Sequence, residues 1–220
     1  ANINLVFPQN ENIALTLGNA SVNLARKPVW PVNSSLTLEA VSGDNTIEEL
    51  AGNLDAATTL TVASGSSLKF LNSGSTALGR PDDERCNFKG FPNSAAIEGL
   101  LELEESWVIF NTGSDQSMRV NNGGKILLST SSSVLETGNL DVDGGSIELV
   151  GSRLLVDAEL KLNNAPVLMD ASAEIVADGA MFIGADGSTI TLGTTSGDTA
   201  RIIANKGMAS SGDLTLAGYG

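Results

Sequence analysis

Carboxylates are the side chains best able to carry chemistry in this sequence, because the chain of 220 residues contains no histidine and only one cysteine. Without histidine, the sequence lacks the commonest general base and the usual activator of a serine or cysteine nucleophile. The same absence argues against a zinc site. Glycine-rich phosphate-binding motifs are also missing. We therefore expect no enzymatic activity, no catalytic residue and no organic cofactor.

Two carboxylate-rich stretches could bind calcium. Residues 80–85 read Arg-Pro-Asp-Asp-Glu-Arg, and residues 141–145 read Asp-Val-Asp-Gly-Gly. Neither has the repeated Gly-Gly-x-Gly-x-Asp pattern that marks calcium-binding β-solenoids, and a run of charges is most often a solvated loop tip. The solvated loop is the favoured interpretation, and calcium is the alternative, with the candidate ligands Asp82, Asp83, Glu84, Asp141 and Asp143.

The single cysteine follows the first of these stretches. Cys86 falls within residues 72–93, whose glycines and prolines predict a long loop. The neighbouring Arg85 and Lys89 would lower the pKa of its thiol, so a reactive thiol is one hypothesis beside a merely unpaired one.

The composition limits the partners of the chain. Its net charge is −14, and the 12 basic residues form no patch, so a nucleic-acid backbone would be repelled. The acidity itself is explained by solubility. Charged residues make up only 17% of the chain, which also contains 24 glycines, and this profile favours short strands and tight turns over helices.

The clearest pattern begins near residue 101, where apolar residues recur at positions i and i+2 in short units. Such alternation predicts strands that turn one face inward. Asn, Asp and Gly residues between the units predict turns. The first inward residues of the successive units are Leu101, Val108, Met118, Ile126, Val134, Leu140, Ile147, Leu154, Leu160, Val167, Ile175, Met181, Ile190, Ile202 and Leu214.

The spacing of these units fits two architectures. The same face returns after 20 residues from Leu140 to Leu160 and after 21 from Leu160 to Met181. Three strands per solenoid coil and a meander of hairpins both produce this spacing. Short strands, glycine-rich bends and few aromatic residues favour the solenoid. The predicted fold is all-β, a single-stranded parallel β-helix with three strands per coil of about 20–22 residues, and an antiparallel β-sandwich is the alternative.

The two halves of the chain differ in regularity. Residues 1–100 contain five of the six prolines and are expected to form a less regular β-rich opening of the same stack, including a cap and the loop at 72–93. Residues 44–50 could form a helical turn there. Residues 101–220 are expected to form the regular solenoid. No linker-like change of composition separates the halves.

A family resemblance rests on the sequence Gly-Asn-Leu-Asp-Val-Asp-Gly-Gly at residues 138–145 and on the leucine-rich short strands that follow. Residues 121–203 resemble the repeat regions of bacterial filamentous-haemagglutinin-type adhesins and autotransporter passengers. This resemblance implies a right-handed parallel β-helix displayed at a cell surface.

We therefore expect an extracellular structural or adhesive surface protein. The start at Ala1 without an initiator methionine fits a removed signal peptide, and no apolar run is long enough to span a membrane. Expected partners are other copies of the chain, through head-to-tail or strand-addition contacts in a filament, and a cell-surface glycan. The candidate assembly residues are Ile3, Leu5, Phe7, Leu155, Leu168, Val176, Phe182, Leu214 and Leu216.

The alternative function is a glycan-active β-helix, such as a polysaccharide lyase or a phage-tailspike-like depolymerase, which would need a pair of carboxylates in one groove. The widely separated Trp30, Trp107 and Tyr219 do not support an aromatic platform for sugar stacking.

Overall fold

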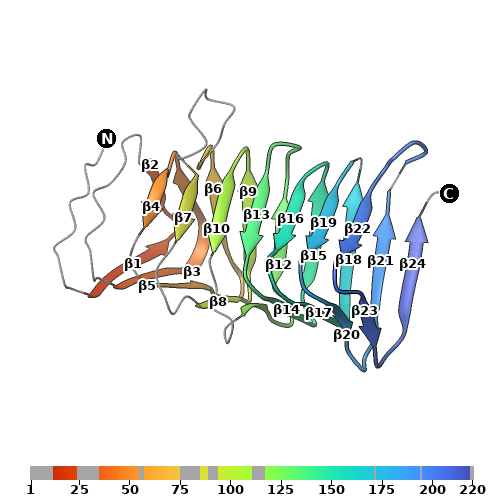
Figure 1. Ribbon diagram of the computed structural model, residues 1–220. Coiled ribbons are helices and arrows are strands. Elements are labelled where there is room, and N and C mark those ends of the chain that lie inside the picture. Colours follow the sequence, from red (N-terminus) through yellow and green to blue (C-terminus); the bar gives the residue numbers. More distant parts are fainter. Residues whose placement is uncertain are drawn as a thin grey trace.

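Figure 1 shows the computed structural model of the chain, in which short strands stack turn upon turn. The structure describes residues 12–23, 35–54, 57–74, 85–88, 94–110, 117–170, 172–193 and 195–218. Within these ranges every helical or extended element is a β-strand, so this part of the chain has no helix long and apolar enough to cross a membrane.

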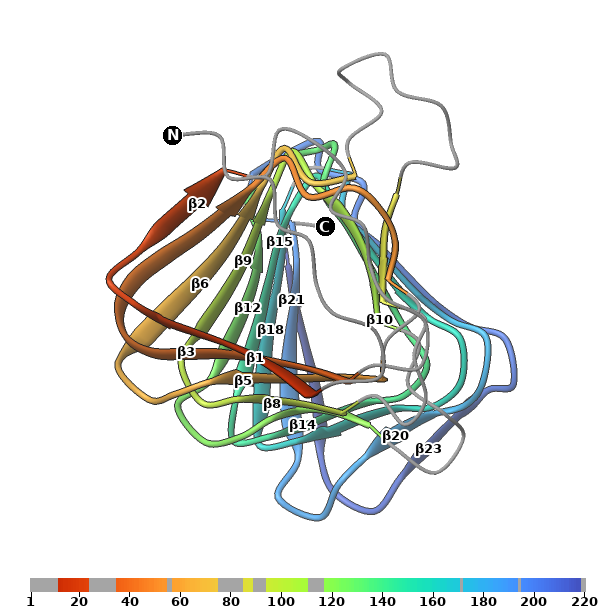
Figure 2. The same ribbon diagram turned by 90° about the vertical axis from the view of Figure 1, so that its left-hand side faces the viewer.

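The strands form three faces around one core, which Figure 2 shows end-on as the sides of a triangle. Sheet I contains β1 (Asn12–Gly18), the first half of β3 (Ser35–Glu48), β5 (Ala57–Val62), β8 (Ser94–Ile97), β11 (Met118–Val120), β14 (Leu140–Asp143), β17 (Leu160–Asn163), β20 (Met181–Ile183) and β23 (Met208–Ser210). Sheet II contains β2 (Ser21–Asn23), the second half of β3, β6 (Ser66–Leu71), β9 (Leu100–Glu104), β12 (Lys125–Leu128), β15 (Ser146–Val150), β18 (Ala165–Asp170), β21 (Ser188–Leu192) and β24 (Leu214–Gly218). Sheet III contains β4 (Gly52–Leu54), β7 (Cys86–Phe88), β10 (Trp107–Phe110), β13 (Val134–Thr137), β16 (Arg153–Val156), β19 (Glu174–Ala177) and β22 (Arg201–Ala204).

Every pairing between described strands is parallel, and each strand pairs with the strand one turn away. Leu140 pairs with Leu160, and Leu160 pairs with Met181, as the sequence spacing predicts. The stack has about seven turns. These pairings confirm the parallel solenoid and rule out the antiparallel sandwich.

The core consists of rows of inward side chains, one from each turn. The inward residues predicted from Leu101 to Ile190 are all buried, and Ile202 and Leu214 pack against the core. One prediction is displaced by a residue. Val134 pairs with Trp107 and Arg153 in an outward row, whereas Leu135 continues the inward row of Val108. Both valine and leucine are apolar, so the alternation pattern alone could not choose between them.

A column of buried serines lies at the corner between sheets II and III. The hydroxyl of Ser106 donates to the carbonyl of Phe70 at 2.9 Å, and that of Ser133 donates to the carbonyl of Leu103 at 2.8 Å. Ser152 donates in the same way to the carbonyl of Leu128 at 3.2 Å. Each bond joins a serine to the preceding turn, so the buried hydroxyl groups are hydrogen-bonded to the backbone at the bend.

The predicted helical turn at residues 44–50 is wrong, because residues 44–48 belong to the extended strand β3. Asn45 and Ile47 point inward and are 1% exposed. The amide nitrogen of Asn45 donates to the carbonyls of Ser42 and Ser67, and its amide oxygen accepts from the N–H of Ala20, each at 3.0 Å. Asn45 therefore joins three turns at a corner of the solenoid and does not begin a helix.

The environment of Cys86 also differs from the expected loop. Cys86 lies in β7 with a fully buried side chain. Burial away from water raises the pKa of its thiol, which is opposite to the lowering expected from nearby basic residues. A reactive thiolate at neutral pH is therefore contradicted. The remainder of the expected loop, at residues 75–84 and 89–93, lies outside the described residues.

Two sheets continue across the boundary that the sequence suggests near residue 100. β8 pairs with β11 in sheet I, and β6 pairs with β9 in sheet II. The stretches expected to include a cap are described only from Asn12 onward.

Candidate functional site

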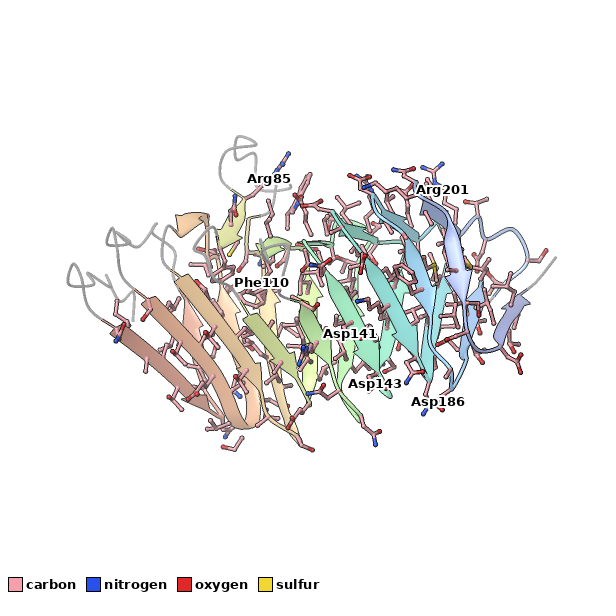
Figure 3. The ribbon with its side chains drawn as sticks, turned by 60° about the horizontal axis from the view of Figure 1, so that its bottom comes forward. Arg85, Phe110, Asp141, Asp143, Asp186 and Arg201 are labelled. Atoms are coloured by element: carbon pink, nitrogen blue, oxygen red, sulfur yellow. The ribbon has the colours of Figure 1, made fainter. Side chains whose placement is uncertain are left out.

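A groove of about 540 Å³ lies on the outer face of sheet I, in the half of the solenoid nearer the C-terminus. Its walls come from β14, β17, β20 and β23, which are four successive turns. Figure 3 shows Asp141, Asp143 and Asp186 on this side of the molecule, away from Arg85 and Arg201. The volume falls within the usual range for pockets that bind small molecules.

A single outward row of side chains runs through this groove. The strand register places Arg119, Asp141, Lys161, Phe182 and Ala209 next to one another on successive turns. Neighbours in such a row are separated by the strand spacing of about 4.8 Å. Two basic groups and one carboxylate thus stand in line with an aromatic ring, and the small Ala209 follows the ring.

A second groove, of about 520 Å³, adjoins the first and shares Asp141 and Lys161 with it. Its lining includes Arg119, Glu159 and Lys206, so basic and acidic groups alternate along it. The ammonium of Lys161 lies 3.2 Å from a carboxylate oxygen of Glu159. Both side chains of this pair are about half exposed, so water screens the attraction.

The rim of the first groove is fixed by the side-chain amide of Asn163. Its nitrogen donates to Asp143 Oδ1 at 2.8 Å and to Asp186 Oδ2 at 3.2 Å, while its oxygen accepts from the N–H of Asp186 at 3.1 Å. Gly184 is needed beneath it, because a Cβ at position 184 would stand 2.2 Å from Asn163 Oδ1. Three hydrogen bonds therefore fix the amide of Asn163, and the absence of a side chain at Gly184 leaves room for it.

The calcium candidates fall into two groups. Asp82, Asp83 and Glu84 lie outside the described residues. Asp141 and Asp143 both project from the outer face of β14, where Asp143 is hydrogen-bonded to Asn163. Among the residues that the structure describes, no three His, Cys, Asp or Glu side chains gather as metal ligands. A calcium site at Asp141 and Asp143 stays a prediction.

The assembly candidates lie on different faces. Leu155, Val176 and Ile203 stand next to one another in an outward row of sheet III. Leu168 belongs to the outer face of sheet II, and Phe182 to that of sheet I. The structure therefore brings only Leu155 and Val176 of the predicted set into one apolar stripe, and Ile203 extends it. Ile3, Leu5 and Phe7 lie outside the described part of the chain.

The last two candidates lie in β24, the final described strand of sheet II. Leu216 pairs with the buried Ile190 and so continues an inward row, yet it is 62% exposed. Met208 likewise continues the row of Met181 and is 50% exposed. Leu214 is partly buried against the core. β23 and β24 each pair with a described strand on one side only, which explains this exposure.

Charged groups on sheet III form a row of their own. Glu174 is 7% exposed and lies between Arg153 and Arg201, which come from the turns before and after it. Its carboxylate oxygens are 3.0 Å from Arg153 Nε and 2.6 Å from Arg201. The groove of about 470 Å³ beside this triad is therefore lined by two guanidinium groups and the one carboxylate that bridges them. Further along the same face, the guanidinium of Arg85 lies 3.8 Å above the centre of the Trp107 ring. This cation–π contact covers one face of the indole ring.

Two titrating groups are perturbed by neighbouring charges. Burial, together with the negative charges of Glu136 and Asp178, raises the pKa of Asp157. The pKa of Lys69 is raised chiefly by its hydrogen bond to Glu104, at 2.7 Å, with Glu102 contributing from 3.2 Å. Neither group is among the residues that line the two grooves of sheet I.

Sequence reasoning missed the role of Phe182 as part of a groove, because it treated this residue only as an assembly contact. It also missed Asn163 and Gly184. One signal was present: the coil lengths bring Asp141, Lys161 and Phe182 to the same position on consecutive turns. Aligning the sequence by its coil lengths of 20 and 21 residues would have placed these three residues in one row.

Comparison with protein-family models, with curated proteins and with solved structures finds no match for this chain.

Proposed function

We propose that the chain is a structural and adhesive surface protein that works outside the cell through the outer faces of a rigid solenoid. The observation that supports this most directly is the filled interior. In the described part of the chain from Leu36 to Ile190, buried apolar side chains fill the inward rows, so the core leaves the outer faces as the surfaces open to a partner. A repeat stack of this kind offers long, flat binding surfaces.

The pattern of the outer faces supports the same proposal. Polar, charged and apolar residues share rows that extend over many turns, as Thr16, Glu39, Thr61, Ala96 and Arg119 do in sheet I. An array of this kind suits contacts spread over a surface. The resemblance of residues 121–203 to the repeat regions of filamentous-haemagglutinin-type adhesins and autotransporter passengers agrees with this proposal.

Surface display can be tested on intact cells of the organism that encodes the chain. Antibodies raised against the folded protein should label unpermeabilised cells, and deletion of the gene should reduce attachment of those cells to their substratum. Labelling that appears only after permeabilisation, with unchanged attachment of the deletion strain, would contradict the proposal. Antibodies against a cytoplasmic protein provide the control for cell integrity.

Self-association stays a further prediction, with a second copy of the chain as the expected partner of β23 and β24. The exposed apolar side chains of Met208 and Leu216 would then be covered by a parallel turn of the neighbour. Sedimentation velocity should show concentration-dependent association that Leu216→Lys abolishes. A wild-type chain that sediments as a monomer at every concentration would contradict it, while surface display would still stand.

A further inference from the structure

We infer that the groove on the outer face of sheet I binds a neutral oligosaccharide through its pyranose rings. This inference names a ligand class for the adhesive surface proposed above and rests on that proposal. It assigns binding without turnover. Its basis is the meeting of an outward aromatic ring, an anchored amide and two carboxylates in one groove of about 540 Å³.

Phe182 supplies the apolar platform. It points outward from β20 in a row where most other members are charged or small. On one side its neighbour is Lys161, and on the other it is Ala209, whose methyl group is too short to cover a phenyl ring. The flat apolar face of a pyranose, made of C–H groups, is complementary to such a ring, which carries negative charge on its faces.

The polar groups of the groove suit the rim of the same sugar. Asp141, Asp143 and Asn163 line the groove together with Phe182. Carboxylates accept hydrogen bonds from hydroxyl groups, and these charge-assisted bonds are the stronger kind. Asn163 is held in place by Asp143 and Asp186 before any ligand arrives. A fixed polar group loses little entropy on binding, which favours affinity and orientation.

Charge argues for a neutral ligand. The two carboxylates in the groove outnumber its one basic group, Lys161, and the whole chain carries a net charge of −14. An acidic polysaccharide would therefore be repelled by the protein as a whole. A neutral sugar meets no such penalty, and its hydroxyl groups can still donate hydrogen bonds to the carboxylates of the groove.

The direction of the groove suggests a linear chain of sugars. Its walls come from β14, β17, β20 and β23, so it crosses three strand intervals, a span of about 14 Å along the solenoid. The adjoining groove at Asp141 and Lys161 extends the surface across sheet I. Several linked rings can lie in this space, with one ring on Phe182.

The test measures binding of defined oligosaccharides to the purified 220-residue chain. Cellohexaose, maltohexaose and xylohexaose serve as neutral probes, and an oligogalacturonate serves as the acidic probe, each titrated by isothermal calorimetry. At least one neutral probe should bind the wild-type chain, and Phe182→Ala should weaken that binding about tenfold, as the loss of one aromatic contact implies. Asp141→Asn is the second variant, since it changes a polar group of the groove without changing its size.

Leu155→Ala is the matched control, because Leu155 is also a half-buried outward apolar residue but lies on sheet III. It should bind the probes as the wild type does. Thermal unfolding of each variant, followed by circular dichroism, confirms that the solenoid is intact. If Phe182→Ala does not fold, Asp141→Asn alone must weaken binding.

Several outcomes would overturn the inference. They are a lack of binding by every neutral probe, equal loss of binding in Phe182→Ala and Leu155→Ala, preference for the acidic probe, or the appearance of new reducing ends that reveal turnover. If only the oligosaccharide inference fails, the antibody would still label intact cells and the deletion strain would still attach poorly. If the proposed surface adhesion fails, neither result would be seen.

Discussion

Two adjacent leucines in β16 provide a direct test of how much the inward and the outward rows each contribute to the free energy of unfolding. Leu154 is fully buried and stands between Leu135 and Ile175 in the core row. Leu155 is the next residue and points outward, beside Glu136 and Val176. The same change, leucine to alanine, can therefore be made on each face of one strand.

The expected costs differ because only one change leaves a cavity. Replacing Leu154 by alanine removes about three methyl or methylene groups from the core, a transfer cost of about 2.4 kcal/mol at about 0.8 kcal/mol each. The cavity adds to this, which places the total within the range of about 2.7–5 kcal/mol. Leu155 is partly solvated in the folded protein, so Leu155→Ala should cost less than about 1 kcal/mol.

Chemical denaturation followed by far-ultraviolet circular dichroism measures the total change. Because each turn contacts only its neighbours, the loss should be concentrated near β16. Hydrogen exchange should accordingly speed up most in β13, β16 and β19 of Leu154→Ala, and much less in β4 or β7. Equal destabilisation by the two variants would refute the assigned register, and so would a greater effect of Leu155→Ala.

Three further results are expected. Native Cys86 should react with a thiol reagent at pH 8 far more slowly than the unfolded chain does, because burial raises the pKa of its thiol. The native state thus holds the thiol proton more tightly than the unfolded state, and the stability of the protein should fall as the pH rises above about 9. Rapid labelling of the native protein would contradict the burial of Cys86. Gly124→Ala should destabilise the solenoid more than Gly123→Ala in a denaturation assay, because a Cβ at position 124 would lie 2.1 Å from the carbonyl oxygen of Ile97. A Cβ at position 123 meets nothing within 4 Å, and its only cost is the positive φ of 86°, about 1–2 kcal/mol. Asp157→Asn should be more stable than the wild type at pH 7, since burial, together with the charges of Glu136 and Asp178, raises the pKa of the Asp157 carboxyl. The folded state then binds the proton more tightly, so the difference should shrink as the pH falls towards 4. A variant less stable than the wild type at pH 7 would contradict these causes.

The architecture could be predicted from the sequence because one physical signal dominates it. Alternating apolar residues separated by turn formers fix short strands, and their return after 20 or 21 residues fixes the stacking distance, as at Leu140, Leu160 and Met181. The choice between parallel and antiparallel pairing was less secure, because both produce the same spacing. It rested on composition and proved correct.

Asn45 and Cys86 were the hardest residues to interpret. Asn45 has the sequence context of a helix cap, but its amide is buried and bonded to backbone groups of three turns. Cys86 stands among glycines, prolines and charges, yet pairs in register with Val108 in a sheet. In both cases the deciding contacts come from other turns of the solenoid, and local propensity contains no trace of them.

The candidate groove was beyond prediction for a related reason. Phe182, Asn163 and Asp141 are individually ordinary outward residues of short strands. They become a site because the register aligns Asp141 with Lys161 and Phe182 on successive turns and pairs Asn163 with Asp143 beside them, and because Ala209 and Gly184 leave the space around them open. A site of this kind is defined by differences between neighbouring turns. It cannot be found by looking for one conspicuous motif.

The error at Val134 shows how strictly such a site depends on register. Because successive side chains of a strand point to opposite faces, a shift by one residue exchanges the inward and outward rows. Applied to β20, the same shift would bury Phe182 and expose Met181 and Ile183, and the groove would vanish. Met181 is fully buried and Ile183 is 2% exposed, so the core itself fixes the outward direction of Phe182. The packing that stabilises the solenoid therefore also positions the ring on which the inferred sugar would lie.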